Sequence, residues 1–162
     1  MTDAKSDSYE TGVLQLIFQN TVTALSILDD LGEGISGEGL TGSDAPGNIY
    51  VSLHTSSPGD VAATGQSTNE ITTGEYGEYA RVGVARSAGG WSVTGDTASN
   101  VAAVTFVEMA TGTTATVTHF GLGTDASGDG NLLYHGVVTP TLAMANGITP
   151  QFDAGALAAQ ET

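Results

Sequence analysis

The stretch 115–139, ATVTHFGLG-TDASGDG-NLLYHGVVT, gives the clearest indication of the fold of this chain. Its two outer segments, 115–123 and 131–139, are rich in β-branched, aromatic and aliphatic residues, a composition that favours β-strands. The segment between them, 124–130, consists of Thr, Asp, Ala, Ser and Gly, most of which favour turns. The stretch therefore predicts two antiparallel strands joined by a hairpin loop.

The simplest register for this hairpin is symmetric about Ser127. It pairs apolar residues with apolar or aromatic ones and histidine with histidine: Leu122 with Leu132, Phe120 with Tyr134, and His119 with His135. Such cross-strand pairs stabilise sheets, so the residues favour this register. Two neighbouring imidazoles without a carboxylate in the pattern are a weak metal site, and we interpret both histidines as strand residues on a partly solvated face.

The segments around the hairpin also read as short strands. Residues 49–54 (IYVSLH) alternate apolar and polar side chains, which is the period of a half-buried strand. Further strands are predicted at 79–87, 91–93 and 100–107, and 147–158 can supply a last one. Short strands with turns at short intervals are typical of an antiparallel β-sandwich or jelly roll. The predicted fold class is mainly β, with one N-terminal α-helix.

That helix is predicted over 11–31, the one segment with convincing helical periodicity. Its apolar residues recur at spacings of 4, 4, 3 and 3 and form one stripe: Leu14, Phe18, Val22, Leu25 and Leu28. Thr11 is the expected N-cap. The stripe packs either on its own domain or against a second chain, and in the second case Leu14, Phe18 and Leu25 make the contact.

The helix divides the rest of the chain into segments. Residues 1–10 are expected to form a flexible acidic arm, and residues 48–162 the β-sandwich domain. Between the helix and this domain, residues 32–47 form a Gly-rich acidic linker that cannot sustain a regular element.

The charge of the chain excludes two classes of partner. Among 162 residues, 18 are Asp or Glu and 3 are Lys or Arg, which gives a formal net charge of −15. Neutralising phosphates takes a cluster of basic residues, so the chain is not expected to bind nucleic acid or an anionic membrane. Most acids fall in the predicted arm, linker, loops and turns, so the acidity belongs to an exposed rim around an ordinary β core.

No catalytic constellation emerges from the sequence. The motifs G-x-S-x-G, H-E-x-x-H and S-x-x-K are all missing. Residues 125–130 (DASGDG) match the start of a calcium loop, but position 12 is Gly136, where that loop requires a bidentate Glu. A hairpin turn explains the same residues, so Asp125 and Asp129 are weak metal candidates. We expect no cofactor and no enzyme activity.

Arg81 and Arg86 are the two basic residues that follow Lys5 in the chain. They are five residues apart on one predicted strand, so they are expected to point to opposite faces. In so acidic a molecule, each arginine can pair with a carboxylate of its own chain. The alternative is a contact with an acidic or carbonyl-rich surface of a partner.

Several segments resemble, in their order, a family of small tailed-phage virion proteins described as tail-fibre-like. The segments are IYVSLHTSSPGD (49–60), TNEI (68–71), YARVGVARSAGGW (79–91), THFGLGT (118–124) and GNLLYHG (130–136). Members begin with a short helix and continue with a strand resembling LYVSLHT and a Pro-Gly turn. Proteins of this size and build are also similar to capsid decoration, or cement, proteins.

The resemblance implies a structural protein of the virion, without a cofactor. The first expectation is a decoration protein on the outside of the head, assembled in the host cytoplasm. It would contact the phage major capsid protein and copies of itself in a homotrimer. The alternative is a tail-fibre or receptor-binding module whose polar loops, 60–78 and 124–130, read the host surface. A hydrolase of the host wall would need paired carboxylates in a cleft, whereas the acids here are scattered through loops.

Overall fold

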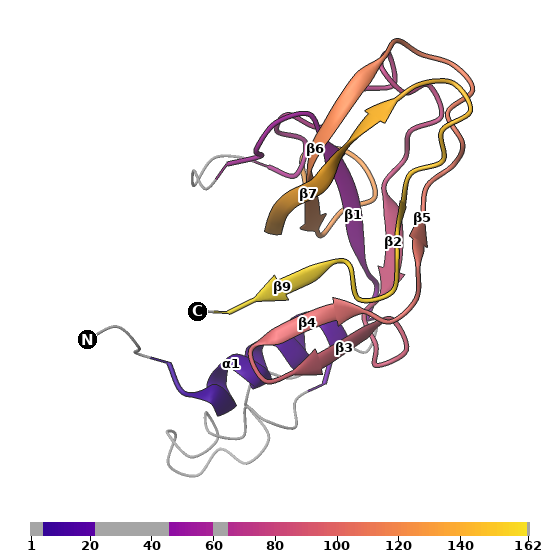
Figure 1. The fold of residues 1–162 in the computed structure, drawn as a ribbon. Helices are drawn as coiled ribbons and strands as arrows, with labels where there is room; N and C mark the ends of the chain where they lie inside the picture. Colours follow the sequence, from indigo (N-terminus) through magenta and orange to yellow (C-terminus); the bar gives the residue numbers. More distant parts are fainter. Residues whose placement is uncertain (1–4, 22–45, 60–64, 162) are drawn as a thin grey trace. The chain divides into compact units, whose positions relative to one another are not determined.

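The structure is a computed structural model of the chain, and it describes residues 5–21, 46–59 and 65–161. One α-helix, α1 (Asp7–Leu14), continues into a π-helical turn, η1 (Gln15–Gln19). The described strands are β1 (Asn48–His54), β2 (Val82–Ala85), β3 (Trp91–Thr94), β4 (Thr97–Asn100), β5 (Val104–Thr105), β6 (Ala115–Gly123), β7 (Leu132–Met144), β8 (Gln151–Phe152) and β9 (Ala158–Gln160) (Figure 1). The prediction of a mainly β fold with antiparallel sheets and one N-terminal helix is confirmed. The jelly-roll arrangement stays a prediction.

The chain divides into two compact units. Unit 1 comprises residues 1–47, 85–102 and 153–162, and unit 2 comprises residues 48–84 and 103–152. The predicted β domain, 48–162, is therefore shared between both units. Two of its segments join the N-terminal helix in unit 1, where β4 pairs with β9.

The buried side chain of Asn100 ties these two segments of unit 1 together. Its amide group donates hydrogen bonds to the carbonyls of Ala102 and Asp153, each at 2.8 Å. Its side-chain oxygen accepts from the backbone N–H of Leu157 at 2.9 Å. The side chain thus satisfies three backbone groups that the short strands leave unpaired.

The helix of unit 1 begins earlier than predicted. Ser6, not Thr11, is the N-cap: its hydroxyl accepts from the N–H of Tyr9, and acidic residues in the first turn complement the helix dipole. The hydroxyl of Thr11 instead donates to the carbonyl of Gly95 at 2.7 Å. Asn20, in the left-handed conformation, ends the helical segment, as is common at a C-terminus. The rest of the predicted helix and the linker up to residue 45 lie outside the described residues.

Unit 2 contains a sheet with the order β2-β1-β6-β7, in which only Ala85 of β2 belongs to unit 1. A second, two-stranded sheet pairs β5 with β8. Phe152 of β8 packs edge-on against Phe120 of β6, with ring centroids 5.8 Å apart, so the two sheets share an aromatic core. Phe106 continues this core toward Tyr79, with ring centroids 6.3 Å apart.

The hairpin of β6 and β7 exists, but its predicted register is wrong by two residues. Leu122 lies opposite Tyr134, and Phe120 lies opposite Gly136. A shift of two residues keeps every side chain on the same face, so the apolar pattern cannot distinguish the two registers. What distinguishes them is space: a Cβ at Gly136 would lie 2.7 Å from the Phe120 ring, so the position opposite Phe120 requires glycine.

Candidate functional site

Polar side chains gather around β1 in unit 2 and form what we call the polar cluster: Ser52, His54, Gln66, Glu70, Tyr79 and Arg81. Four of these residues are buried, and Glu70 and Tyr79 are half-buried. They come from β1, from the segment 65–71 and from the residues just before β2. Residues 60–78 are predicted from their composition to form a polar surface loop, but Gln66 and Tyr76 within this range are fully buried.

Arg81 lies at the centre of the polar cluster. Its Nε donates to Oε1 of Glu70 at 2.7 Å, and its Nη2 donates to Oε2 at 2.6 Å. Its Nη1 donates to the carbonyl of Asp125 at 2.9 Å, and Nη2 also reaches the carbonyl of Gly128 at 2.7 Å. The guanidinium is therefore engaged within unit 2, which is the internal pairing expected as the alternative to a partner contact.

Tyr79 completes the surroundings of the Glu70 carboxylate. Its hydroxyl donates to Oε1 of Glu70 at 2.5 Å and accepts from the N–H of Leu53 at 3.1 Å. Burial raises the pKa of Tyr79 far above its usual value, and the negative charge of Glu70 adds to the rise. The hydrogen bond from Tyr79 to Glu70 therefore persists through the physiological pH range.

The loop 124–130 faces Arg81 with its backbone. Two carbonyls of this loop accept from the guanidinium, and the carboxylate of Asp129 accepts from the hydroxyl of Ser67. Among the described residues, no group of three or more His, Asp or Glu side chains is arranged to hold a metal ion. A metal ion at the carbonyls of Asp125 and Gly128 would be repelled by the guanidinium of Arg81, which already binds them. A metal role for Asp125 and Asp129 stays an untested prediction.

Gln66 connects the loop 124–130 to the sheet. Its side-chain Nε2 donates to the carbonyl of Tyr50 at 3.0 Å, and its Oε1 accepts from the N–H of Asp125 at 3.2 Å. The side chain occupies the space above Gly123, where a Cβ would lie 2.3 Å from the Gln66 amide. Gly123 is therefore required for this buried contact.

Ser52 and His54 have the geometry of a serine–histidine pair. Oγ of Ser52 lies 2.9 Å from Nε2 of His54, and Nδ1 lies 2.8 Å from the carbonyl of Thr68. Both side chains are completely buried. A nucleophile has to meet its substrate, so in this arrangement the pair is a structural contact.

The predicted partner contacts Leu14 and Phe18 are completely buried in unit 1. The ring of Phe18 lies 4.7 Å from that of Trp91, and Nε2 of Gln19 donates to the carbonyl of Trp91 at 2.8 Å. The described part of the helix therefore packs on its own unit. Leu25, the third predicted contact, lies outside the described residues.

Arg86 follows β2, whereas Arg81 precedes it, so the two arginines do not share a strand. The guanidinium of Arg86 donates to the carbonyls of Ile17, Leu16 and Pro46 at 2.7, 2.8 and 3.0 Å. A cation at the last carbonyls of a helix is favoured by the helix dipole. This role of Arg86 has no signal in the sequence, because the carbonyls become available only once the helix ends at Asn20.

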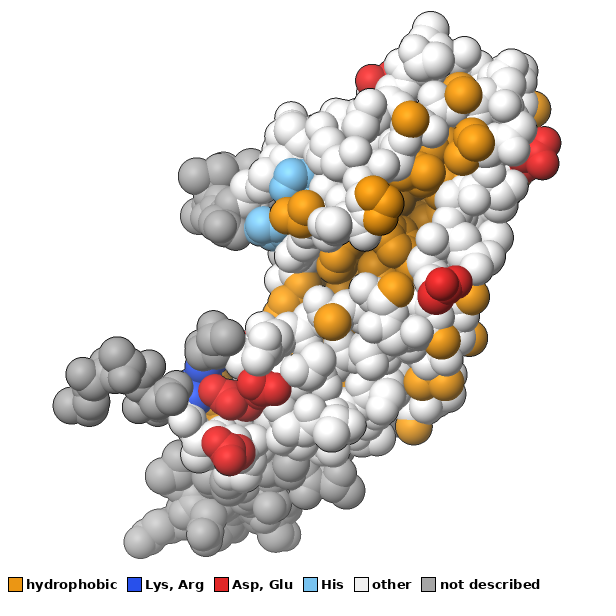
Figure 2. All heavy atoms as spheres, in the orientation of Figure 1, with side chains coloured by type: hydrophobic (Ala, Val, Ile, Leu, Met, Phe, Trp, Pro, Cys, Tyr) orange, Lys and Arg blue, Asp and Glu red, His pale blue; other side chains and the backbone are white. Residues whose placement is uncertain are grey.

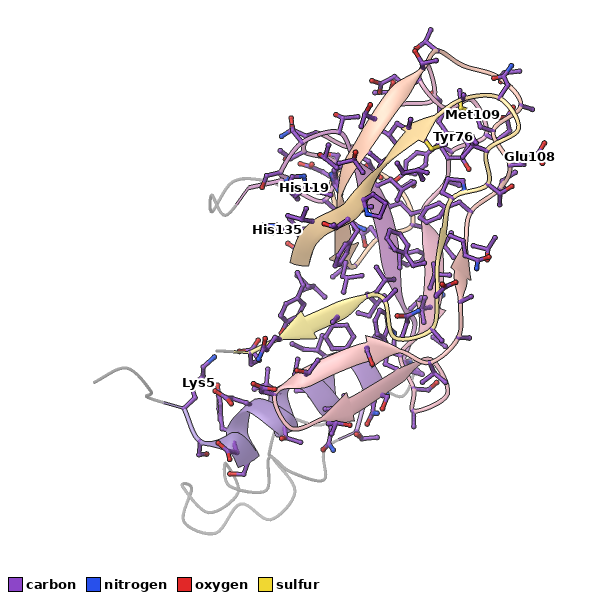
Figure 3. All side chains as sticks on the ribbon, in the orientation of Figure 1. Lys5, Tyr76, Glu108, Met109, His119 and His135 are labelled. Carbon is purple, nitrogen blue, oxygen red and sulfur yellow. The ribbon has the colours of Figure 1, made fainter. Side chains whose placement is uncertain are left out.

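The three histidines project from neighbouring strands. His54 of β1 lies opposite His119 of β6, and His135 of β7 lies opposite Gly121. The direct pairing of His119 with His135 is therefore wrong, although both lie on one side of the hairpin (Figure 3). The hydroxyl of Thr118 lies 2.8 Å from Nδ1 of His119.

Residues 38–160 match the family described as Podophage GP4 fiber I protein gp80. The chain belongs to this family. The match includes every described strand, the polar cluster and Arg86, and it confirms the predicted resemblance to tailed-phage virion proteins. No curated protein matches the chain.

Membership in the gp80 family makes the chain a phage structural protein. The hydrogen bonds of the polar cluster connect the segments 65–71 and 124–130 to each other and to the sheet of unit 2. Within the described residues, no helix is long and apolar enough to span a membrane.

Proposed function

We propose that the chain is a non-enzymatic component of a podophage tail fibre. The observation that carries this proposal is the match to a fibre protein family over residues 38–160. This range includes every described strand. The polar cluster supports it, because its polar groups are engaged with one another and with backbone, as expected of a structural module.

The loops 65–71 and 124–130 suit the outer end of such a fibre. Their exposed side chains include Ser67, Asn69, Asp125 and Asp129. Arg81 and Gln66 hold the backbone of loop 124–130 from below. A loop held in one conformation loses little entropy on binding, which favours recognition of a host surface.

Capsid decoration is the second candidate, and the distribution of acids favours it. On the face shown in Figure 2, acidic side chains are scattered over the surface rather than gathered in one place. Such a surface keeps particles dispersed through mutual repulsion. In this role the chain would bind the major capsid protein and copies of itself in a homotrimer.

Localisation on intact particles tests the proposal. Antibodies against the chain, detected by gold labelling in electron microscopy, are expected to mark the tail. Quantitative mass spectrometry of purified virions is expected to give a copy number per particle that matches the other tail proteins. Label over the head with several hundred copies per particle would establish decoration and overturn the fibre proposal.

A further inference from the structure

Both ring nitrogens of His54 contact a neighbouring polar group. The carbonyl of Thr68 can only accept a hydrogen bond, so Nδ1 of His54 carries the proton. Nε2 then accepts from the hydroxyl of Ser52 at 2.9 Å. Burial lowers the pKa of His54, so the buried site favours the neutral imidazole, which both contacts suit.

A second proton on this imidazole has no favourable place. It would sit on Nε2 and face Oγ of Ser52, whose own hydrogen would then need another acceptor. Ser52 and His54 are both completely buried, so bulk water does not reach Nε2. An imidazolium in this position would be buried without hydration, which is costly.

The charged and titratable groups around His54 do not remove this cost. Glu70 lies across an isolated bridge from His54, but both its carboxylate oxygens accept from Arg81 and one also from Tyr79. Burial is the largest cause that lowers the pKa of His54, and the charges of Arg81 and His119 lower it further. The hydrogen bond to Thr68 and the charge of Glu70 oppose this effect only in part.

The segment 65–71 covers His54 and is attached to β1 along its length. The N–H of Ile71 donates to the carbonyl of Leu53 at 2.9 Å, and the N–H of Thr55 donates to the carbonyl of Asn69 at 3.0 Å. The segment is also attached to the loop 124–130, since the N–H of Gln66 donates to the carbonyl of Asp129 at 2.6 Å. Whatever displaces the segment therefore also loosens the loop.

We propose that His54 is an acid-sensitive latch, whose protonation releases the segment 65–71 from β1 and with it the loop 124–130. In the closed state, the segment 65–71 is paired with β1 and the site accepts only the neutral imidazole. In the open state, the segment is released and water hydrates the imidazole in either protonation state. Acid therefore shifts the equilibrium toward the open state through linkage, without breaking the Thr68 contact directly.

Amide hydrogen exchange at pH 7.5 and pH 5.0 tests the latch, after correction for the intrinsic rate at each pH. The protection factors of Thr55, Gln66 and Ile71 are expected to fall at pH 5.0, by up to about thirty-fold, the limit set by the pKa of a free histidine. The amides of β3 and β4 serve as the internal control and keep their protection. Unchanged protection of 65–71 at pH 5.0 overturns the proposal.

A variant and two matched controls assign the effect to His54. Asn places a donor near the position of Nδ1 and does not titrate, so His54→Asn is expected to keep its protection at both pH values. His119→Gln and His135→Gln are expected to retain the acid response of the natural chain. An acid response in His54→Asn equal to that of the natural chain would show that another group is responsible.

Nitrogen chemical shifts of the imidazoles provide a measurement that needs no His54 variant. The His54 ring is expected to stay neutral at pH values where the segment 65–71 is protected, and to become protonated only as that protection falls. Protonation of His54 with full protection of the segment would contradict the latch.

Discussion

Arg81 binds the carboxylate of Glu70 in a bidentate manner, with Nε 2.7 Å from Oε1 and Nη2 2.6 Å from Oε2. The same guanidinium donates to two carbonyls of the loop 124–130. One side chain, just before β2, therefore joins the segment 65–71 to the hairpin loop 124–130.

Removing Arg81 is expected to destabilise unit 2 strongly. The Arg81→Ala variant leaves a largely buried carboxylate without its cation, which costs about 3–5 kcal/mol of the free energy of unfolding. Urea denaturation measures this cost. Glu108 is exposed and points away from the fold (Figure 3), so Glu108→Gln is a control expected to stay within about 0.5 kcal/mol. Equal stability of the two variants would contradict the central role of Arg81.

Phe18 is expected to hold the helix on unit 1. Phe18→Ala removes a completely buried ring that lies 4.7 Å from Trp91, and such a loss costs about 3–5 kcal/mol. Because Trp91 is the one tryptophan of the chain, its fluorescence reports on this unit, and its emission should shift to longer wavelength. Tyr9→Ala, at an exposed position of the same helix, should leave the emission unchanged. A red shift in that control would mean that the emission does not report on the Phe18 contact.

Gly136 is expected to resist substitution because of Phe120. A Cβ in Gly136→Ala would lie 2.7 Å from the Phe120 ring, and such overpacking costs about 1–3 kcal/mol. Gly74→Ala is the matched control, since its Cβ would meet its nearest atom at 3.6 Å. Thermal unfolding of both variants distinguishes a steric effect from the general effect of replacing glycine. If both variants unfold at the same temperature, the observed register of the hairpin is in doubt.

Alkaline pH is expected to destabilise the polar cluster through Tyr79. Its pKa is raised in the folded chain, so its contribution to stability is complete below the unfolded pKa, near 10, and declines as the pH rises further. Burial also raises the pKa of Tyr76, so part of the decline belongs to that residue. Urea unfolding from pH 8 to pH 11 should show a weaker decline in Tyr79→Phe than in the natural chain. The control Tyr9→Phe should behave as the natural chain does, and an equal decline in Tyr79→Phe would exclude Tyr79 as the source.

Calcium is expected to leave the chain unchanged. The carbonyls of Asp125 and Gly128 already accept from Arg81. If calcium bound the folded chain, a free calcium concentration of about a hundred times the Kd would raise the free energy of unfolding by about 2.7 kcal/mol. Melting temperatures with added calcium and with EDTA should therefore agree, and a clear rise with calcium would restore Asp125 and Asp129 as ligands.

The hairpin of β6 and β7 shows which features could be predicted from the sequence and which could not. Both strands and the loop were predicted because their composition is local information. The register was not, because registers two residues apart have the same apolar pattern and differ only in whether Gly136 makes room for Phe120. The candidate site shows the same limit: Arg81 was singled out as one of few cations, but its carboxylate, Glu70, could not be identified among so many acids.

The fold class, the hairpin, the existence of an N-terminal helix and the family resemblance could all be predicted from the sequence, since each depends on residues close together in the chain or on the order of motifs. The tertiary structure is needed to show that the chain forms two units, that Arg86 binds the carbonyls at the end of the helix, and that the buried His54 contacts the carbonyl of Thr68. These features depend on contacts between distant segments. Hydrogen bonds and burial select such contacts only when the whole chain has folded.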